Sequence, residues 1–191
     1  MSATTSVLQQ KNAKHLIQSF SDLSYIKNPE STHIISRADG VYIYDNDGKK
    51  ILDSMSGLWC VNMGYGQQSI IDAVNEQMKE LVYYNNFFGS SHPSAIKLSE
   101  MIADKTPEGM NKVYFCGSGS EANDTVVRLV RHYWAARGNP SKSVIISRTN
   151  AYHGSTMAGA SLGGMSAMHS QGGLPIADIE HVEQPYYYEA C

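Results

Sequence analysis

Apolar residues recur at the spacing of a helix face in two stretches near the middle of the chain. In residues 67–82 they fall at every third or fourth position, which predicts an amphipathic helix. A second helix is predicted over residues 93–105, where Pro93 takes the first-turn position that proline favours. Apolar residues between Leu16 and Leu23 predict a short helix in an N-terminal arm. The apolar side of the 67–82 helix comprises Ile70, Ile71, Val74, Met78 and Leu81.

Shorter patterns predict strands. Residues 40–44 alternate, residues 45–48 contain the Asp and Gly of a tight turn, and residues 50–53 return, which predicts a β-hairpin. Short apolar runs bounded by turn residues predict buried strands at 113–116, 143–147 and 179–182.

Two stretches have no clear period. Residues 54–66 are rich in Gly, Met and aromatic residues, so they form either a buried connector or the lining of a pocket. The apolar run 58–61 favours burial in the core. Residues 161–173 contain two glycine pairs and are predicted to be a loop, after a short helix that begins near Ser155.

The chain is organised around residues 113–137, where a predicted strand leads through a glycine–serine turn into a helix. Ser118 stands three residues before Glu121, which is the spacing of a capping box. The free N–H groups and positive dipole end of such a helix, together with the hydroxyls of Ser118 and Ser120, favour an anion such as a phosphate. The simpler interpretation is that the turn only connects the strand to the helix and caps it.

This turn differs from two familiar phosphate motifs. No lysine follows the glycines as in a P-loop, and the GxGxxG spacing is absent. A Rossmann-type nucleotide binder would also need an acidic residue at the end of the next strand, where Ser147 and Arg148 stand instead. That class therefore ranks last among the alternatives.

Strands and helices alternate from residue 113 onward, which is typical of an α/β fold with a parallel sheet. Ligands of such sheets bind at the carboxyl ends of the strands. Residues 117–120 and 152–154 each follow a predicted strand, so we expect them to face the same crevice.

Composition and charge argue against several classes of function. A net charge of −3 and a pI near 6.1 give no basic surface, so no nucleic-acid partner is expected. No apolar run approaches the roughly 20 residues of a membrane helix, and the N-terminus has no apolar signal segment. We therefore expect a cytoplasmic protein with no membrane partner.

The three cysteines are Cys60, Cys116 and Cys191. Their odd number and wide spacing argue against a disulfide framework and against a zinc site, so no metal is expected. Cys60 and Cys116 stand among apolar residues and are predicted to be small core residues.

Four segments resemble the class III (omega) aminotransferases, which are pyridoxal-phosphate-dependent enzymes of fold type I. The segments are GLWCVN at 57–62, YNNFF at 84–88, SGSEAND at 118–124 and YHGST at 152–156. The resemblance runs from about Phe20 to the end of the chain and is strongest to the amine:pyruvate branch. It implies the N-terminal part of the aspartate aminotransferase-like three-layer α/β/α fold, with an incomplete sheet. Residues 1–66 would be an N-terminal arm and β-hairpin segment of the small domain, and residues 67–191 the first part of the large cofactor-binding domain.

The resemblance also implies a cofactor, pyridoxal 5'-phosphate. Its binding residues would be Ser118, Gly119, Ser120, Tyr152, His153 and Gly154. The first three would hold the phosphate, at the anion site that the turn itself predicts. Tyr152 would stack on the pyridine ring, with His153 and Gly154 placing it. Without the resemblance, Tyr152 would be a core tyrosine and His153 a hydrogen-bonded structural histidine. Glu121 and Asn123 are expected to cap and support the helix.

Substrate-pocket residues follow from the same resemblance: Leu58, Trp59, Phe87, Phe88 and, on the N-terminal arm, Phe20. Phe87 and Phe88 would reach the active site of the other subunit of a homodimer. From the residues alone, the first four would be core or interface residues. Aromatic walls favour an amine with a hydrocarbon body, which leaves putrescine, taurine, β-alanine and aryl amines open as donors.

The implied reaction moves an amino group from an amine or ω-amino acid to pyruvate. It needs a lysine that holds the cofactor as a Schiff base and an acidic partner for the pyridinium nitrogen, and in the family both lie beyond the position of Cys191. The lysines after residue 92 lie in helical, turn or strand-flanking contexts, as solvated lysines do: Lys97, Lys105, Lys112 and Lys142. We therefore expect no catalytic residue in this chain. It would be a fragment or truncated product of a protein more than twice as long, inactive alone and prone to aggregate because its sheet is incomplete.

A function of another class stays open. The chain would then be a non-catalytic binding or dimerisation protein that keeps part of the fold and binds a phosphate ligand. A downstream lysine preceded by an acidic residue would distinguish the enzyme from this alternative.

Overall fold

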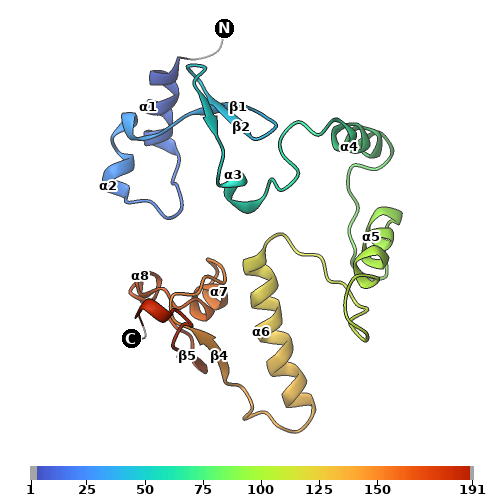
Figure 1. Cartoon of the computed structure of the whole chain (residues 1–191). Coiled ribbons are helices and arrows are strands. Elements are labelled where there is room, and N and C mark those ends of the chain that lie inside the picture. Colours follow the sequence, from blue (N-terminus) through green and yellow to red (C-terminus); the bar gives the residue numbers. More distant parts are fainter. Residues whose placement is uncertain (1–3, 190–191) are drawn as a thin grey trace. The chain divides into compact units, whose positions relative to one another are not determined.

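The computed structural model describes residues 4–189, and the chain divides into two compact units, Met1–His92 and Pro93–Cys191 (Figure 1). Each unit contains one small β-sheet and several helices, so the fold is mixed α/β. In the part of the chain that the structure describes, no helix is both long and apolar enough to cross a membrane.

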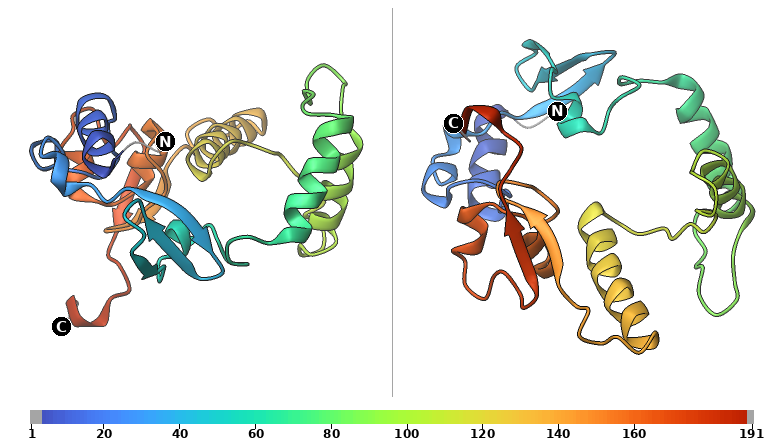
Figure 2. Two further views of the ribbon diagram at one scale, coloured as in Figure 1. Left: turned by 90° about the horizontal axis from the view of Figure 1, so that it is seen from above. Right: turned by 60° about the horizontal axis from the view of Figure 1, so that its bottom comes forward.

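The first unit is built on a three-stranded antiparallel sheet of β1 (Ile35–Asp39), β2 (Tyr42–Asp45) and β3 (Lys50–Leu52), in that order (Figure 2). The predicted hairpin is confirmed as β2 and β3. The Asp45 carboxylate accepts two backbone N–H groups of the turn, at 3.0 and 2.8 Å, which stabilises the reversal of the chain. The sequence pattern did not reveal β1, which pairs with the other edge of β2.

The N-terminal helix lies earlier than the apolar pattern predicted. α1 spans Thr5–His15, and the apolar residues that suggested a helix come after its end. Polar contacts fix its position, because the Gln9 amide donates to the Thr32 carbonyl at 2.9 Å and the Asn12 amide donates to the Thr32 hydroxyl at 3.1 Å. The short helices that follow are α2 (Leu23–Ile26) and the 3-10 helix η1 (Pro29–Ser31).

The segment after β3 is exposed. Its one helical turn, α3 (Ser56–Trp59), carries Leu58 and Trp59, whose side chains are 63% and 79% exposed. The prediction that residues 54–66 lie in the core is therefore wrong for this chain. Among the described residues of the first unit, no layer packs over this segment, so its apolar run gains no burial there.

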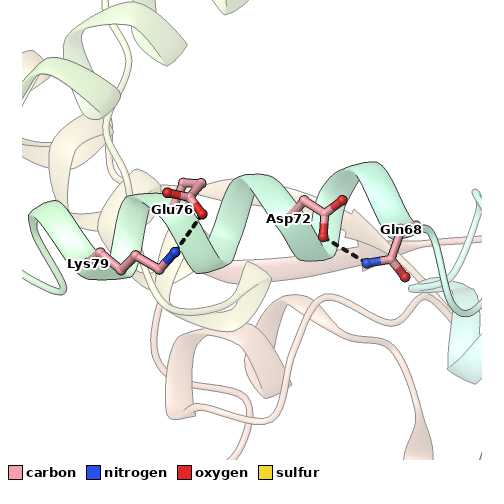
Figure 3. Close-up of polar contacts among 4 residues, drawn as sticks. All are labelled: Gln68, Asp72, Glu76 and Lys79. Atoms are coloured by element: carbon pink, nitrogen blue, oxygen red, sulfur yellow. Dashed lines mark hydrogen bonds and ion pairs between the residues drawn. The ribbon is translucent and has the colours of Figure 1, made fainter.

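The first predicted amphipathic helix is confirmed as α4 (Gln68–Glu80). On its polar face the Gln68 amide donates to Asp72 and the Lys79 ammonium pairs with Glu76, both at 2.7 Å (Figure 3). These contacts join residues four and three positions apart, which lie next to each other on a helix surface. The polar face thus supports the helix locally, while its apolar residues are exposed.

The second unit contains a pair of parallel strands. β4 (Ile145–Arg148) and β5 (Ile179–Val182) pair in register over their whole length (Figure 2). This confirms both strands and the parallel arrangement that the alternation of elements predicted. The helices of this unit are α5 (Pro93–Ala103), α6 (Gly119–Ala136), α7 (Met157–Leu162), α8 (Ser166–His169) and the 3-10 helix η2 (Tyr187–Glu189).

Two predictions for this unit are wrong. Residues 113–116 pair with no other strand among the described residues, and the Tyr114 side chain is exposed. Without a partner a strand has no ladder of backbone hydrogen bonds, so the apolar run alone does not form one. In addition, α8 interrupts the stretch predicted to be a loop; it is a single turn with Met168 buried.

The buried apolar core is small and lies mostly around α7. Its described members are Ile26, Val127, Ala158, Ala160, Met168 and Ile179. The predicted core cysteines, Cys60 and Cys116, are exposed, which corrects that prediction. The preceding residues, Trp59 and Phe115, are exposed with them, because the described residues supply too few packing partners.

Gly164 generates a stability prediction, because a Cβ at this position would lie 2.2 Å from the Arg148 carbonyl oxygen and 2.5 Å from the Thr149 Cα. Both are main-chain atoms at the end of β4, so they cannot move aside without disturbing the strand. We expect Gly164→Ala to lower the free energy of unfolding of the second unit by about 1–3 kcal/mol, measured by urea denaturation. Gly119→Ala is the matched control, since a Cβ there meets nothing within 4 Å. Equal effects of the two substitutions would contradict the prediction.

Candidate functional site

The N-terminus of α6 is capped much as its sequence predicted. The Ser118 hydroxyl accepts the N–H of Glu121 at 3.1 Å, and the Glu121 carboxylate returns to accept the N–H of Gly117 at 2.7 Å. In the usual capping box the glutamate bonds the N–H of the capping residue itself. Here the glutamate bonds the N–H of the preceding residue, Gly117. The N–H groups that follow Ser118 therefore remain available to other acceptors.

Four hydrogen-bond donors remain at this turn. Within residues 4–189, the N–H groups of Gly119 and Ser120 have no acceptor. The hydroxyls of Ser118 and Ser120 each accept one backbone N–H, so each still has a proton to donate. These donors lie at the positive end of an 18-residue helix, where an anion is favoured.

The loop after β4 packs directly on this turn. The N–H of Ser155 donates to the Ser120 hydroxyl at 3.0 Å, and the Asn123 amide donates to the His153 carbonyl at 2.7 Å. Gly154 has a φ of +131°, and a Cβ on it would lie 2.5 Å from the Ser120 Oγ, so only glycine fits. The predicted proximity of the two segments is confirmed, and Asn123 makes the supporting contact expected of it.

Asp124 is a structural residue that sequence reasoning missed. One carboxylate oxygen accepts the Thr156 hydroxyl at 2.5 Å and the Gly159 N–H at 3.0 Å, at the N-terminus of α7. Thr156 itself caps this helix through the same N–H. The signal available in the sequence was an acidic residue in the first turns of α6 and a threonine before a small-residue helix. That signal is too common to stand out alone.

Tyr152 lies in the loop between two fixed points. The carbonyl of Ala151 accepts the Gly164 N–H at 2.9 Å on one side, and His153 is held by Asn123 on the other. The Tyr152 side chain is 54% exposed, so the interpretation as a core tyrosine is wrong. His153 is also exposed, and the contact that holds it is made by its backbone carbonyl. The loop therefore carries an exposed aromatic residue directly before the residue that Asn123 of α6 holds.

The residues expected in a substrate pocket all lie in the first unit. Leu58 and Trp59 share α3, while Phe87 and Phe88 are neighbours whose ring centroids are 6.0 Å apart. These four side chains and that of Phe20 are exposed, so the interpretation of the four as core residues is wrong. Among the described residues of this unit, nothing covers them.

The backbone that carries Leu58 and Trp59 is strained. All four residues of α3 have positive φ values, between +52° and +65°, so the turn is left-handed. Two backbone hydrogen bonds of 2.8 and 2.9 Å close it. A left-handed conformation costs about 1–2 kcal/mol for each residue other than glycine, and three of the four are not glycine. Such strain persists only where surrounding contacts hold it.

Asp53 and Tyr65 lie beside this turn. The Tyr65 hydroxyl donates to the Asp53 carboxylate at 2.7 Å, and this bond lowers the pKa of Asp53 below its ordinary value of 3.8. The same bond, with burial and the Asp53 charge, raises the pKa of the Tyr65 hydroxyl. A carboxyl whose folded pKa is lowered stabilises the fold above its unfolded pKa. That contribution is lost as the pH falls through the folded value.

Asp124 generates a prediction for the second unit. Asp124→Ala leaves the Thr156 hydroxyl and the Gly159 N–H without their shared acceptor, so we expect a loss of about 1–3 kcal/mol in the free energy of unfolding. Thermal denaturation measures this loss, and hydrogen exchange at the Gly159 amide should become faster. Asp104→Ala, which removes an exposed carboxylate of the same unit, is the control. A Gly159 amide that exchanges at the parent rate would show that Asp124 does not support α7.

Sequence comparisons identify relatives over most of the chain. The sequence model of the family described as aminotransferase class-III matches residues 25–190. A putrescine–pyruvate aminotransferase of Pseudomonas aeruginosa is 54% identical over 186 residues, which cover 97% of this chain and 41% of that enzyme. A diaminobutyrate–2-oxoglutarate transaminase of Halomonas elongata is 43% identical over 155 residues, covering 81% of this chain and 33% of that enzyme.

Solved structures agree. A transaminase from the marine bacterium Virgibacillus matches with a TM-score of 0.90 and 39% identity, over 95% of this chain and 41% of that one. A structure from the directed evolution of transaminases by ancestral reconstruction matches with a TM-score of 0.93 and 40% identity, over 98% of this chain and 41% of that one. A thermostable omega transaminase, in which a tryptophan was replaced by glycine for the synthesis of bulky amines, matches with a TM-score of 0.91 and 37% identity, over 95% of this chain and 40% of that one.

The chain thus spans about two fifths of the length of the first of these relatives. Its neighbours confirm the expected fold class, the N-terminal part of the fold type I transaminase architecture with small, incomplete sheets. Because the family match covers most of the residues and agrees with the fold, this chain belongs to the class III aminotransferases.

Proposed function

We propose that this chain is the phosphate-binding and ring-stacking part of a pyridoxal 5'-phosphate-dependent transaminase. The whole protein would move an amino group from an amine or ω-amino acid to pyruvate. One observation carries the proposal. Hydrogen bonds join the first turn of α6 to the loop at residues 153–155, while the N–H and hydroxyl donors of that turn stay available to an anion.

The donor set fits a phosphate group. The N–H groups of Gly119 and Ser120 and the hydroxyls of Ser118 and Ser120 would donate to the phosphate oxygens. Acceptance of the Ser155 N–H orients the Ser120 hydroxyl, and the close approach of Gly154 keeps other side chains out of that space. The dipole of α6 adds a favourable field for the negative charge.

Tyr152 would cover one face of the pyridine ring and exclude water from it. Its loop is anchored on both sides, so the tyrosine is presented without a large loss of freedom on binding. His153 and Gly154 would place the ring through their backbone. When bound, pyridoxal phosphate supplies the electron sink that makes breaking a bond at the amine carbon possible.

The amine is proposed to contact Leu58 and Trp59, with Phe87, Phe88 and Phe20 as further apolar walls. Two comparisons support this assignment: one relative is named for putrescine and pyruvate, and one structural neighbour carries a tryptophan-to-glycine change made for bulky amines. An apolar wall favours an amine with a hydrocarbon body. The active protein is proposed to be a homodimer in which Phe87 and Phe88 reach into the active site of the other subunit.

The reactive amine of a transaminase is proposed to lie outside these 191 residues. Lys97, Lys105 and Lys112 are exposed, and the Lys142 ammonium lies 3.5 Å from the centroid of the Trp134 ring. In the described structure none of the four has a hydrogen bond to the α6 turn or the Tyr152 loop. We therefore propose that this chain by itself binds the cofactor without transaminating.

Binding of pyridoxamine 5'-phosphate to this chain tests the phosphate site, because this form has no aldehyde to react with lysines. We expect its Kd to be at least about tenfold lower than that of pyridoxamine, since each charge-assisted hydrogen bond is worth about 1.5–3 kcal/mol. Ser120→Ala should weaken the binding by about tenfold, whereas Ser141→Ala, an exposed serine of the same unit, should not. Fluorescence titration gives both constants. Equal affinity for the two forms would refute phosphate recognition.

The catalytic part of the proposal is tested on the protein from its native source. Borohydride reduction followed by intact-mass measurement should give a chain heavier than 21.0 kDa with one cofactor fixed to one lysine. A 21.0 kDa chain without a site-specific adduct would instead favour the non-catalytic binding or dimerisation protein.

A further inference from the structure

The left-handed turn of α3 is held by polar contacts. The Asp53 carboxylate oxygen that accepts the Tyr65 hydroxyl at 2.7 Å also accepts the N–H of Gly57 at 2.8 Å. At the end of the turn, the Ser56 hydroxyl donates to the Val61 carbonyl at 2.9 Å. The Leu58 and Trp59 side chains are exposed, so their burial does not offset the strain of the backbone. The hydrogen bonds are what remains to hold the turn in this conformation.

Both partners of the carboxylate–hydroxyl pair are fixed to the sheet of the first unit. Asp53 directly follows β3, and its N–H donates to the Val41 carbonyl at 3.0 Å. Tyr65 exchanges two backbone hydrogen bonds with Gly40, which directly follows β1, at 2.8 and 3.2 Å. The pair therefore joins the strained turn to a rigid framework at two points. A cavity of about 120 Å³ lies between these segments, lined in part by Asp53, Ser56 and Tyr65.

We propose that Asp53 and Tyr65 are positioning residues that keep α3 left-handed and thereby set the direction in which Trp59 is presented to the amine substrate. Neither side chain would touch the substrate. Their effect passes through the Gly57 N–H to the backbone of the next two residues, so the pair limits the size of amine that fits against the indole. The link to the amine rests on the proposed function, whereas the link to the Trp59 geometry does not.

The test uses this chain with Trp134→Phe, so that Trp59 is the only tryptophan. Tyr65→Phe removes the hydroxyl and keeps the ring. We expect the Gly57 and Trp59 amides to exchange about tenfold faster and the near-UV circular dichroism of Trp59 to decrease, while the amides of β2 keep their rates. Tyr25→Phe is the matched control, because the Tyr25 hydroxyl has no hydrogen-bond partner among the described residues.

A second variant separates the pair from the rest of the unit. Asp53→Ala removes the acceptor of both the Tyr65 hydroxyl and the Gly57 N–H, so its effects should be at least as large as those of Tyr65→Phe. The double variant should add little to Asp53→Ala, because the Tyr65 contact is already lost in that variant. Additive effects, an unchanged Trp59 signal, or faster exchange in β2 to the same degree would each overturn the proposal. If the pyridoxamine 5'-phosphate titration fails while this test succeeds, the pair positions Trp59 but the role toward an amine is lost.

Discussion

Ser120 and Gly154 approach so closely that no side chain fits between them, and this approach determines how α6 lies against the segment that follows β4. The Ser155 N–H bond to Ser120 and the Asn123 bond to His153 depend on it. One turn further along, Asp124 reaches the N-terminus of α7. Three consecutive contacts therefore join two helix N-termini to one loop. The anion donors and the aromatic ring proposed for the cofactor are placed by this joint.

In both units, hydrogen bonds to a carboxylate hold segments together. Few of the described apolar side chains are buried, and in each unit a carboxylate joins two segments by hydrogen bonds: Asp124 at α7 and Asp53 at α3. A carboxylate oxygen can accept from a hydroxyl and a backbone N–H together, so one residue joins two segments.

Local signals in the sequence were sufficient where an element depends only on its own residues. The hairpin, α4, the cap of α6 and the strand β5 follow from turn chemistry, helical spacing and short apolar runs. Prediction failed where the structure of a segment depends on contacts with residues that are distant in the sequence. Residues 113–116 have the composition of a strand but no ladder, and Trp59 has the composition of a core residue but no cover.

The candidate site divides in the same way. The α6 turn was recognisable from its glycines, serines and capping glutamate, and the loop at Tyr152 from the family resemblance. The left-handed backbone of α3 was not recognisable, because only one of its four residues is a glycine. What holds it, the Asp53–Tyr65 pair, joins residues twelve positions apart through a tertiary contact that no local pattern contains.

The cap that Glu121 forms on Gly117 affects how the α6 turn would distinguish ligands. The groups that this turn offers and contacts, in the described part of the chain, are backbone N–H groups, hydroxyls, an amide and carboxylates. A phosphate bound there would be held by directed neutral donors beside acidic side chains. Such a site loses little affinity as ionic strength rises, because few mobile ions are displaced on binding. Recognition there would depend on directed hydrogen bonds to a single phosphate group and not on its charge alone.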